Sequence, residues 1–210
     1  MTLREEIFQC YHDLLLSYKD KTVSKQDKEK CNKSFLHCEM DYQSLFQFGE
    51  GKRLITLHVK PSWAKFDSFL YQIYENEQDE IWLYWKKEII CHKIYKKVQD
   101  MSFFEFQNKS GLHSEMNKIF PPEKRKFSEK QVQTVRKLYQ QKLKEDVQEI
   151  YGYDGTEFYL RIYSEPVADY DGWSHMPEEW KLFAELTKIV ADVSEMRDKR
   201  FYTAKTIFHN

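Results

Sequence analysis

One short run near the C-terminus alternates large apolar side chains with polar or smaller ones, and it most constrains how this chain can fold. After Asp154-Gly155, the apolar residues Phe158, Leu160 and Ile162 occupy every second position. Side chains at every second position of a strand share one face, so this spacing predicts a strand with a buried face. Asp-Gly is typical of hairpin turns, and we expect a turn to precede the strand.

Helices are predicted from three stretches with apolar residues at three-and-four spacing. These stretches are residues 3–18, residues 128–150 and a stretch that begins at Pro177. Ser128 and Gln131 form a capping-box pattern at the start of the second stretch. Proline is favoured in the first turn of a helix, which supports the start of the third stretch at Pro177.

The other strands are predicted from short runs of aromatic and β-branched residues. Residues 35–59 hold two apolar runs around the segment Gly49–Lys52, which predicts a hairpin. A meander of three strands is predicted at residues 66–74, 81–85 and 89–95, with a helix as the open alternative for residues 62–73. The phenylalanines at 103, 104 and 106 predict one more strand, and the tail from 201 to 208 is either an edge strand or a packed extension.

The fold class that follows is α+β. We expect a mostly antiparallel, aromatic-rich sheet with about three packed helices, because aromatic residues make up 16% of the chain. With 210 residues, the chain is predicted to form a single domain over residues 1–210, with Pro121-Pro122 as the candidate internal boundary.

The chain is expected to be cytoplasmic, with no membrane partner. Its N-terminus lacks the basic start and apolar run of a signal peptide. No apolar stretch approaches the ~20 residues that cross a bilayer. The four cysteines lack CxxC spacing, so we expect them to be reduced thiols.

Familiar catalytic patterns are missing from the sequence. It contains no glycine-rich phosphate loop, no G-x-S-x-G nucleophile elbow and no HExxH zinc motif. The only set of residues with zinc-ligand chemistry is Cys31, His37, Cys38, Cys91 and His92. Adjacent residues on a strand point to opposite faces, so each close pair would supply only one ligand. We therefore expect no catalytic residue, no metal site and no cofactor.

Charge is unevenly distributed, although the net charge is only -1. Residues 118–144 hold nine Lys or Arg against two Glu, whereas residues 145–200 hold fourteen Asp or Glu against six Lys or Arg. This polarity predicts either that the two segments pack together or that they form two oppositely charged binding surfaces. The basic segment could bind nucleic acid, and its candidate contacts are Lys124, Arg125, Lys126, Lys130, Arg136 and Lys137.

Acidic and aromatic residues of the C-terminal segment form the main candidate site. Tyr and Trp are favoured at the centres of protein interfaces, and carboxylates attract a basic partner. We predict an exposed partner-binding loop from Asp169 to Trp173, with Glu165 nearby; its residues are Glu165, Asp169, Tyr170, Asp171 and Trp173. Clustered carboxylates could instead bind a divalent metal or perform acid–base chemistry, which would make the protein a metal-dependent enzyme acting on nucleic acid or nucleotide.

A family resemblance supports the protein-binding hypothesis. At Asp154-Gly155-Thr156, Trp173-Ser174 and Pro177 with Trp180, the chain resembles a group of bacterial proteins that share a DGT strand followed by a WS…PxxW helix. Some of that group resemble the small immunity proteins of toxin–immunity pairs. The resemblance covers residues 151–190 and supplies no catalytic residue. It implies a non-catalytic, immunity- or antitoxin-like protein that occludes a basic partner with its acidic aromatic surface.

Overall fold

The structure, a computed structural model, describes residues 1–20, 22–63, 65–102, 105, 112–141, 143 and 155–207. The chain divides into two compact units. Unit 1 comprises Met1–Gln47 and Ile89–Pro121, and unit 2 comprises Phe48–Glu88 and Pro122–Asn210. One boundary between the units falls at Pro121-Pro122. Whether the chain folds as the single domain expected from its length stays a prediction.

The described part of unit 1 is helical. Its elements are α1 (Leu3–Lys19), α2 (Lys25–Ser44), the greater part of α3 (Glu88–Val98) and α5 (Leu112–Ile119). Helix α1 packs against α2, and a capping box between Thr2 and Glu5 begins α1. A small cluster of apolar residues around Leu45 and Val98 joins α2 to α3.

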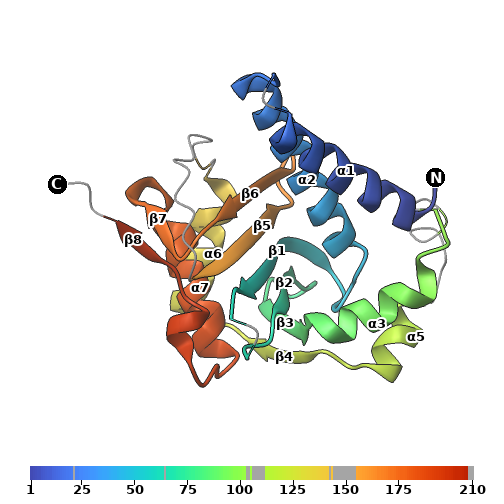
Figure 1. Cartoon of the computed structure of the whole chain (residues 1–210). Helices are drawn as coiled ribbons and strands as arrows, with labels where there is room; N and C mark the ends of the chain where they lie inside the picture. Colours follow the sequence, from blue (N-terminus) through green and yellow to red (C-terminus); the bar gives the residue numbers. More distant parts are fainter. Residues whose placement is uncertain are drawn as a thin grey trace. The chain divides into compact units, whose positions relative to one another are not determined.

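Unit 2 is built on an antiparallel sheet of six strands in the order β4-β3-β2-β1-β5-β6 (Figure 1). The strands are β1 (Lys52–Pro61), β2 (Phe69–Glu75), β3 (Ile81–Lys87), β4 (Glu123–Lys126), β5 (Thr156–Ile162) and β6 (Ala168–Gly172). A second, parallel pair joins β7 (His175–Pro177) to β8 (Lys205–Ile207). These strands confirm the α+β class and the mostly antiparallel sheet.

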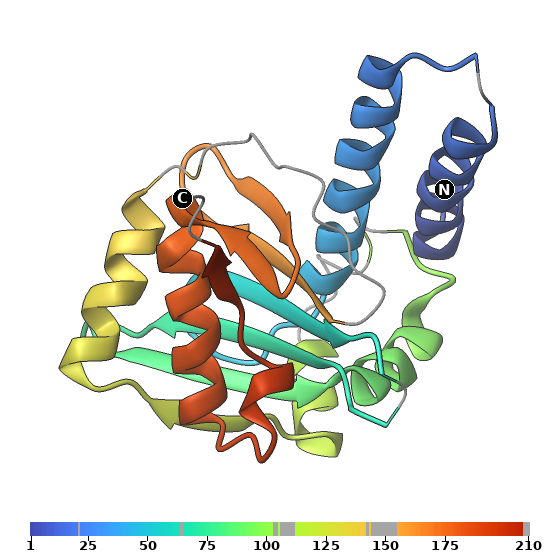
Figure 2. The ribbon, with the colours of Figure 1, turned by 60° about the vertical axis from the view of Figure 1, so that its left-hand side comes forward.

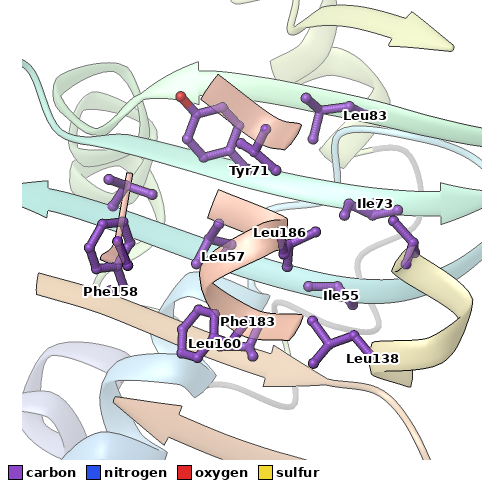
Figure 3. Packing of buried hydrophobic residues seen from close by; sticks show 14 of the residues in the cluster. Ile55, Leu57, Tyr71, Ile73, Leu83, Leu138, Phe158, Leu160, Phe183 and Leu186 are labelled. Carbon is purple, nitrogen blue, oxygen red and sulfur yellow. The ribbon is translucent and has the colours of Figure 1, made fainter. Parts of the chain in front are cut away.

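One face of this sheet is covered by α6 (Glu129–Gln140) and α7 (Lys181–Val193), as Figure 2 shows. The short 3-10 helices η1 (Glu178–Trp180) and η2 (Lys199–Phe201) flank α7 in the chain. The helices and the sheet share one apolar core (Figure 3), whose labelled residues are Ile55, Leu57, Tyr71, Ile73, Leu83, Leu138, Phe158, Leu160, Phe183 and Leu186. The strand predicted around Phe158 is therefore confirmed, with its apolar residues on the core side.

Several predictions about individual elements are confirmed. The helix at 3–18 is α1, and the strands at 66–74 and 81–85 are β2 and β3, which rules out the helical alternative for residues 62–73. Ser128 and Gln131 do form a capping box at the start of α6. The last helix begins with one 3-10 turn after Pro177, and the tail adds the short strand β8.

Two predicted strands are wrong. The first arm of the hairpin at 35–59 lies mostly in α2, which begins after the N-cap Ser24, and only the second arm is a strand. The strand predicted at 89–95 is helix α3. Its buried residues Cys91, Ile94 and Val98 are three and four positions apart, so helical spacing prevails over the β-branched composition.

Two other predictions concern chain that is only partly described. The helix predicted at 128–150 ends at Gln140, because Gln141 is extended, and residues 142 and 144–150 lie outside the described residues. The predicted turn at Asp154 and the strand predicted around Phe103, Phe104 and Phe106 also lie outside the described residues.

Candidate partner-binding surface

The predicted partner loop is part of a strand. Residues 168–172 form β6, which pairs with β5 in the register Arg161 opposite Asp169 and Tyr159 opposite Asp171. The prediction of an exposed loop over these residues is therefore wrong. The cause is the alternation Ala168, Tyr170, Gly172 against two aspartates, which fits a strand with one buried face.

Asp169 is held in a buried ion pair within the β5–β6 hairpin. Its two carboxylate oxygens accept hydrogen bonds from Arg161, at 2.6 Å from Nε and 2.7 Å from Nη2. Only 5% of the Arg161 side chain and 10% of the Asp169 side chain are exposed. A bidentate pair of this kind fixes the geometry of both side chains. Asp169 therefore links β6 to β5 through its two hydrogen bonds from Arg161.

Tyr170 lies on the opposite face of β6, in the apolar core. Its ring packs edge-on against Trp180, with ring centroids 5.8 Å apart. Because the side chain is buried, its direct contribution is to position β6 against the helices.

Asp171 and Trp173 lie at one end of the β5–β6 hairpin. Trp173 comes directly after β6, and continuing the β5–β6 register by one residue would place it opposite Glu157, two residues after Asp171. The Trp173 ring covers Gly155 so closely that a Cβ there would lie 2.5 Å from the indole. Both Asp171 and Trp173 are half-buried, so each keeps part of its surface in solvent.

A second tryptophan joins this end of the sheet. Ser62 donates hydrogen bonds to the Gly155 carbonyl from its backbone N–H and its hydroxyl, each at 2.9 Å, and this fixes the loop that carries Trp63. Trp63 is exposed. We name Glu157, Asp171, Trp173 and Trp63 the Trp173 surface.

Glu165 lies at the other end of the hairpin, in the exposed connection between β5 and β6. At about 3.3 Å per residue, the five residues of β6 separate it from Trp173 by on the order of 16 Å or more. Val167, in the same connection, is also exposed. The structure therefore brings Asp171 and Trp173 together but sets Glu165 apart from both.

The six candidate nucleic-acid contacts lie on β4 and α6, and several are paired. Arg125 bonds Glu195 at 2.6 Å, Arg136 bonds Glu75 at 2.7 Å and Lys126 bonds Glu80. Lys124 lies over the Trp82 ring at 5.6 Å. Lys130 and Lys137 are exposed on α6. Part of the basic charge is thus used inside unit 2, and the Arg125–Glu195 pair joins the basic segment to the acidic one.

The sheet face opposite α6 and α7 carries buried polar side chains. Thr56 lies directly opposite both Gln72 and Arg161 in the strand register, and all three are buried. Gln72 accepts hydrogen bonds from the Phe48 backbone N–H at 3.0 Å and from the Tyr74 hydroxyl at 2.7 Å. Buried polar groups of this kind are stabilising only when hydrogen-bonded, which makes the face specific in its packing.

His58 and Glu88 lie close together on the same face. His58 Nε2 lies 3.7 Å from the Glu88 carboxylate, and the imidazole stacks on Tyr159. Interaction with His58 lowers the pKa of Glu88 to about 2, against the opposing effect of burial, and Ser68 and Lys60 assist. Glu88 is therefore a carboxylate at neutral pH.

Sequence reasoning missed this polar face, although its signal is present in β1. Thr56, His58 and Lys60 alternate there with the core residues Leu57 and Val59. Alternation of this kind marks a strand whose second face is polar, but burial of that face cannot be read from one strand.

Three of the candidate zinc ligands are the cysteines at 31, 38 and 91. Cys31 and Cys38 are half-buried, and Cys91 is buried. Over the described ranges of the chain, no group of three or more His, Cys, Asp or Glu is arranged to hold a metal ion.

Comparisons with protein-family models, with curated proteins and with solved structures find no match to this chain. In the part of the chain that the structure describes, none of the helices combines the length and the apolar character needed to span a bilayer.

Proposed function

We propose that the chain is a non-catalytic protein-binding protein, of the immunity or antitoxin kind, that occludes a basic surface of its partner. The Trp173 surface is the proposed contact. The observation that carries the proposal is the half-buried Trp173 at the end of β6, two residues after Asp171 and opposite Glu157 in the continued register, with the exposed Trp63 next to the Ser62 that bonds Gly155.

Tryptophan at such a place supports binding because it offers a large area with few rotatable bonds. Interface residues whose loss costs most are enriched in Trp and Tyr. The ring of Trp173 lies against Gly155, which restricts it before any partner arrives. Carboxylates beside the rings favour a basic partner and speed its association.

The buried pair of Arg161 and Asp169 supports the proposal indirectly. It holds β6 on β5; Asp171 follows Asp169 on that strand, and Trp173 comes directly after the strand ends. A surface on a fixed strand loses little conformational entropy on binding. In this proposal Asp169 and Tyr170 position the strand, while Asp171 and Trp173 contact the partner.

The nucleic-acid alternative has weaker support. Arg125, Lys126 and Arg136 already pair with carboxylates of unit 2. Each pair would have to be broken or shared before the cation could neutralise a phosphate.

Affinity capture from the source organism tests the proposal. The wild-type chain, the double variant Asp171→Asn with Trp173→Ala, and the control Glu178→Gln with Glu179→Gln are immobilised in parallel. The control removes two exposed carboxylates of the same unit that lie outside the Trp173 surface. We expect one basic protein to bind the wild type and the control but not the double variant, with retention that weakens as salt rises. Equal retention by all three chains, or no retained protein, would contradict the proposal.

A further inference from the structure

Helix α1 of unit 1 carries a solvent-exposed face that is symmetric about one residue. Glu5, Phe8, His12, Leu16 and Lys19 are all exposed. Their spacings of three, four, four and three residues place them on one side of a helix with 3.6 residues per turn. Glu5 and Lys19 each lie seven positions from His12, and Phe8 and Leu16 each lie four positions from it.

Two large apolar side chains stand out on this face. Phe8 is 66% exposed and Leu16 is 51% exposed, and the Phe8 ring stacks on His12 with centroids 6.2 Å apart. Helix α1 already packs against α2 within unit 1. This face therefore adds an apolar stripe beyond what that contact needs, and such stripes mark interaction sites.

We infer that α1 binds α1 of a second copy of this chain, antiparallel, about a two-fold axis that passes beside His12. In that arrangement Phe8 of each copy meets Leu16 of the other. The Glu5 carboxylate of each copy meets the Lys19 ammonium of the other. The face is thus complementary to itself in both apolar and charged positions, as an isologous interface requires.

Two further properties of α1 fit an antiparallel contact with a second copy of the chain. Antiparallel helices place the positive end of each macrodipole beside the negative end of the other. Glu5 accepts a hydrogen bond from the Thr2 backbone N–H at 2.8 Å within its own chain. A carboxylate has about four lone-pair sites, so Glu5 can still bind an ammonium group.

The contact is small, which sets the conditions of the test. Seventeen residues of α1 give a helix about 25 Å long. A contact of that length lies at the low end of protein interfaces, so the dimer should be weak. Sedimentation velocity of the full chain from low micromolar to several hundred micromolar covers the range.

Replacing an apolar residue by glutamate, on this face and elsewhere in unit 1, tests whether this face in particular forms the dimer. Leu16→Glu should raise the dimer dissociation constant about tenfold or more. Ile119→Glu is the matched control, because Ile119 lies in α5 of the same unit and is 54% exposed. It should leave the dissociation constant unchanged.

A charge exchange tests the pairing itself. Lys19→Glu brings two carboxylates together in the dimer, and Glu5→Lys brings two ammonium groups together, so each should weaken association. The double variant restores opposite charges at both contacts and should recover association, although it carries the local cost of both changes to α1. Circular dichroism checks that each variant keeps its helix content.

The inference is overturned by a chain that stays monomeric through the whole concentration range. It is also overturned if Ile119→Glu weakens association as much as Leu16→Glu does, or if the charge exchange fails to restore association. Association that depends on Trp173 instead would show that copies meet through the partner surface and not through α1.

Discussion

Replacing Asp169 should reveal how strongly the hairpin beneath the Trp173 surface depends on one buried ion pair. In Asp169→Asn, the amide oxygen can still accept one hydrogen bond, but the negative charge beside Arg161 is lost. The Arg161 guanidinium, with only 5% of its side chain exposed, then remains charged after the Asp169 carboxylate is lost.

The magnitude follows from the geometry. Both bonds are short, at 2.6 and 2.7 Å, and hydrogen bonds to charged groups contribute roughly 1.5–3 kcal/mol each. Removing one partner of a buried pair typically costs about 3–5 kcal/mol. Because asparagine keeps one acceptor, we expect Asp169→Asn to lower the free energy of unfolding by about 2–4 kcal/mol.

The assay is urea unfolding at pH 7 followed by tryptophan fluorescence. All five tryptophans, at positions 63, 82, 85, 173 and 180, belong to unit 2, so the signal reports that unit. Glu195→Gln is the matched control, since it also replaces a carboxylate by an amide, here in the pair with Arg125. That pair is exposed: 47% of the Arg125 side chain and 71% of the Glu195 side chain are accessible to solvent. Exposed pairs contribute about 0–1 kcal/mol, so the control should cost no more than that.

The reasoning is refuted if the two variants cost the same, or if Asp169→Asn costs less than about 1 kcal/mol. A second test removes both charges together. Arg161→Met with Asp169→Leu should cost less than the single change Asp169→Ala, because the buried guanidinium is removed together with the carboxylate that compensates it.

Three smaller perturbations test other parts of unit 2. The pKa of folded Glu88 is about 2, below its ordinary 4.5, so its contact with His58 stabilises the fold above pH 4.5 and this stabilisation is lost as pH falls towards 2. In Glu88→Gln this loss of stability in acid should be smaller by about 1–2 kcal/mol. The magnitude is kept low because solvent screens a side chain that is 36% exposed. Titration of the urea midpoint with pH checks it, and identical profiles for variant and wild type would contradict it. Gln131→Ala should cost about 0.5–1 kcal/mol by removing the acceptor of the α6 capping box, and an unchanged urea midpoint would count against that role. Gly51→Ala should lower the free energy of unfolding by roughly 2 kcal/mol or more, because Gly51 has a φ of +95° and an added Cβ would lie 2.4 Å from the Glu75 carbonyl oxygen. A loss of under about 1 kcal/mol would show that the turn relaxes.

Local patterns with a fixed period were predictable from the sequence. The alternation around Phe158 predicted β5 and its core face, and helical spacing predicted α1 and α7. Ser128 with Gln131 located the start of α6 to the residue. Each of these depends on neighbours within one turn or one strand.

The incorrect predictions arose where the residue composition of a segment and the spacing of its apolar residues indicated different secondary structures. Cys91, Ile94 and Val98 have helical spacing, but the β-branched residues around them suggested a strand. Residues 25–44 of α2 are so polar that their composition does not indicate which face of a helix would be buried. In both segments tertiary packing, which one sequence does not display, decides the outcome.

The candidate site was only partly predictable for a related reason. Asp171 and Trp173 are close in sequence and remain close in the fold, but Glu157 and Trp63 join them only through strand pairing and the Ser62–Gly155 bonds. The bond between Asp169 and Arg161 also spans two strands. Pairing of distant strands follows from the whole sheet and not from any local run of residues.

The affinity of the captured partner for Trp173 variants tests the central claim most directly. Titration calorimetry compares the wild type, Trp173→Ala, Asp171→Asn and the control Glu178→Gln with Glu179→Gln. The account predicts that Trp173→Ala raises the dissociation constant about 30-fold, the equivalent of about 2 kcal/mol, and that Asp171→Asn raises it less and weakens its dependence on salt, while the control changes neither. A dissociation constant for Trp173→Ala equal to that of the wild type, in a variant that keeps its fold, would contradict the claim that this surface binds the partner.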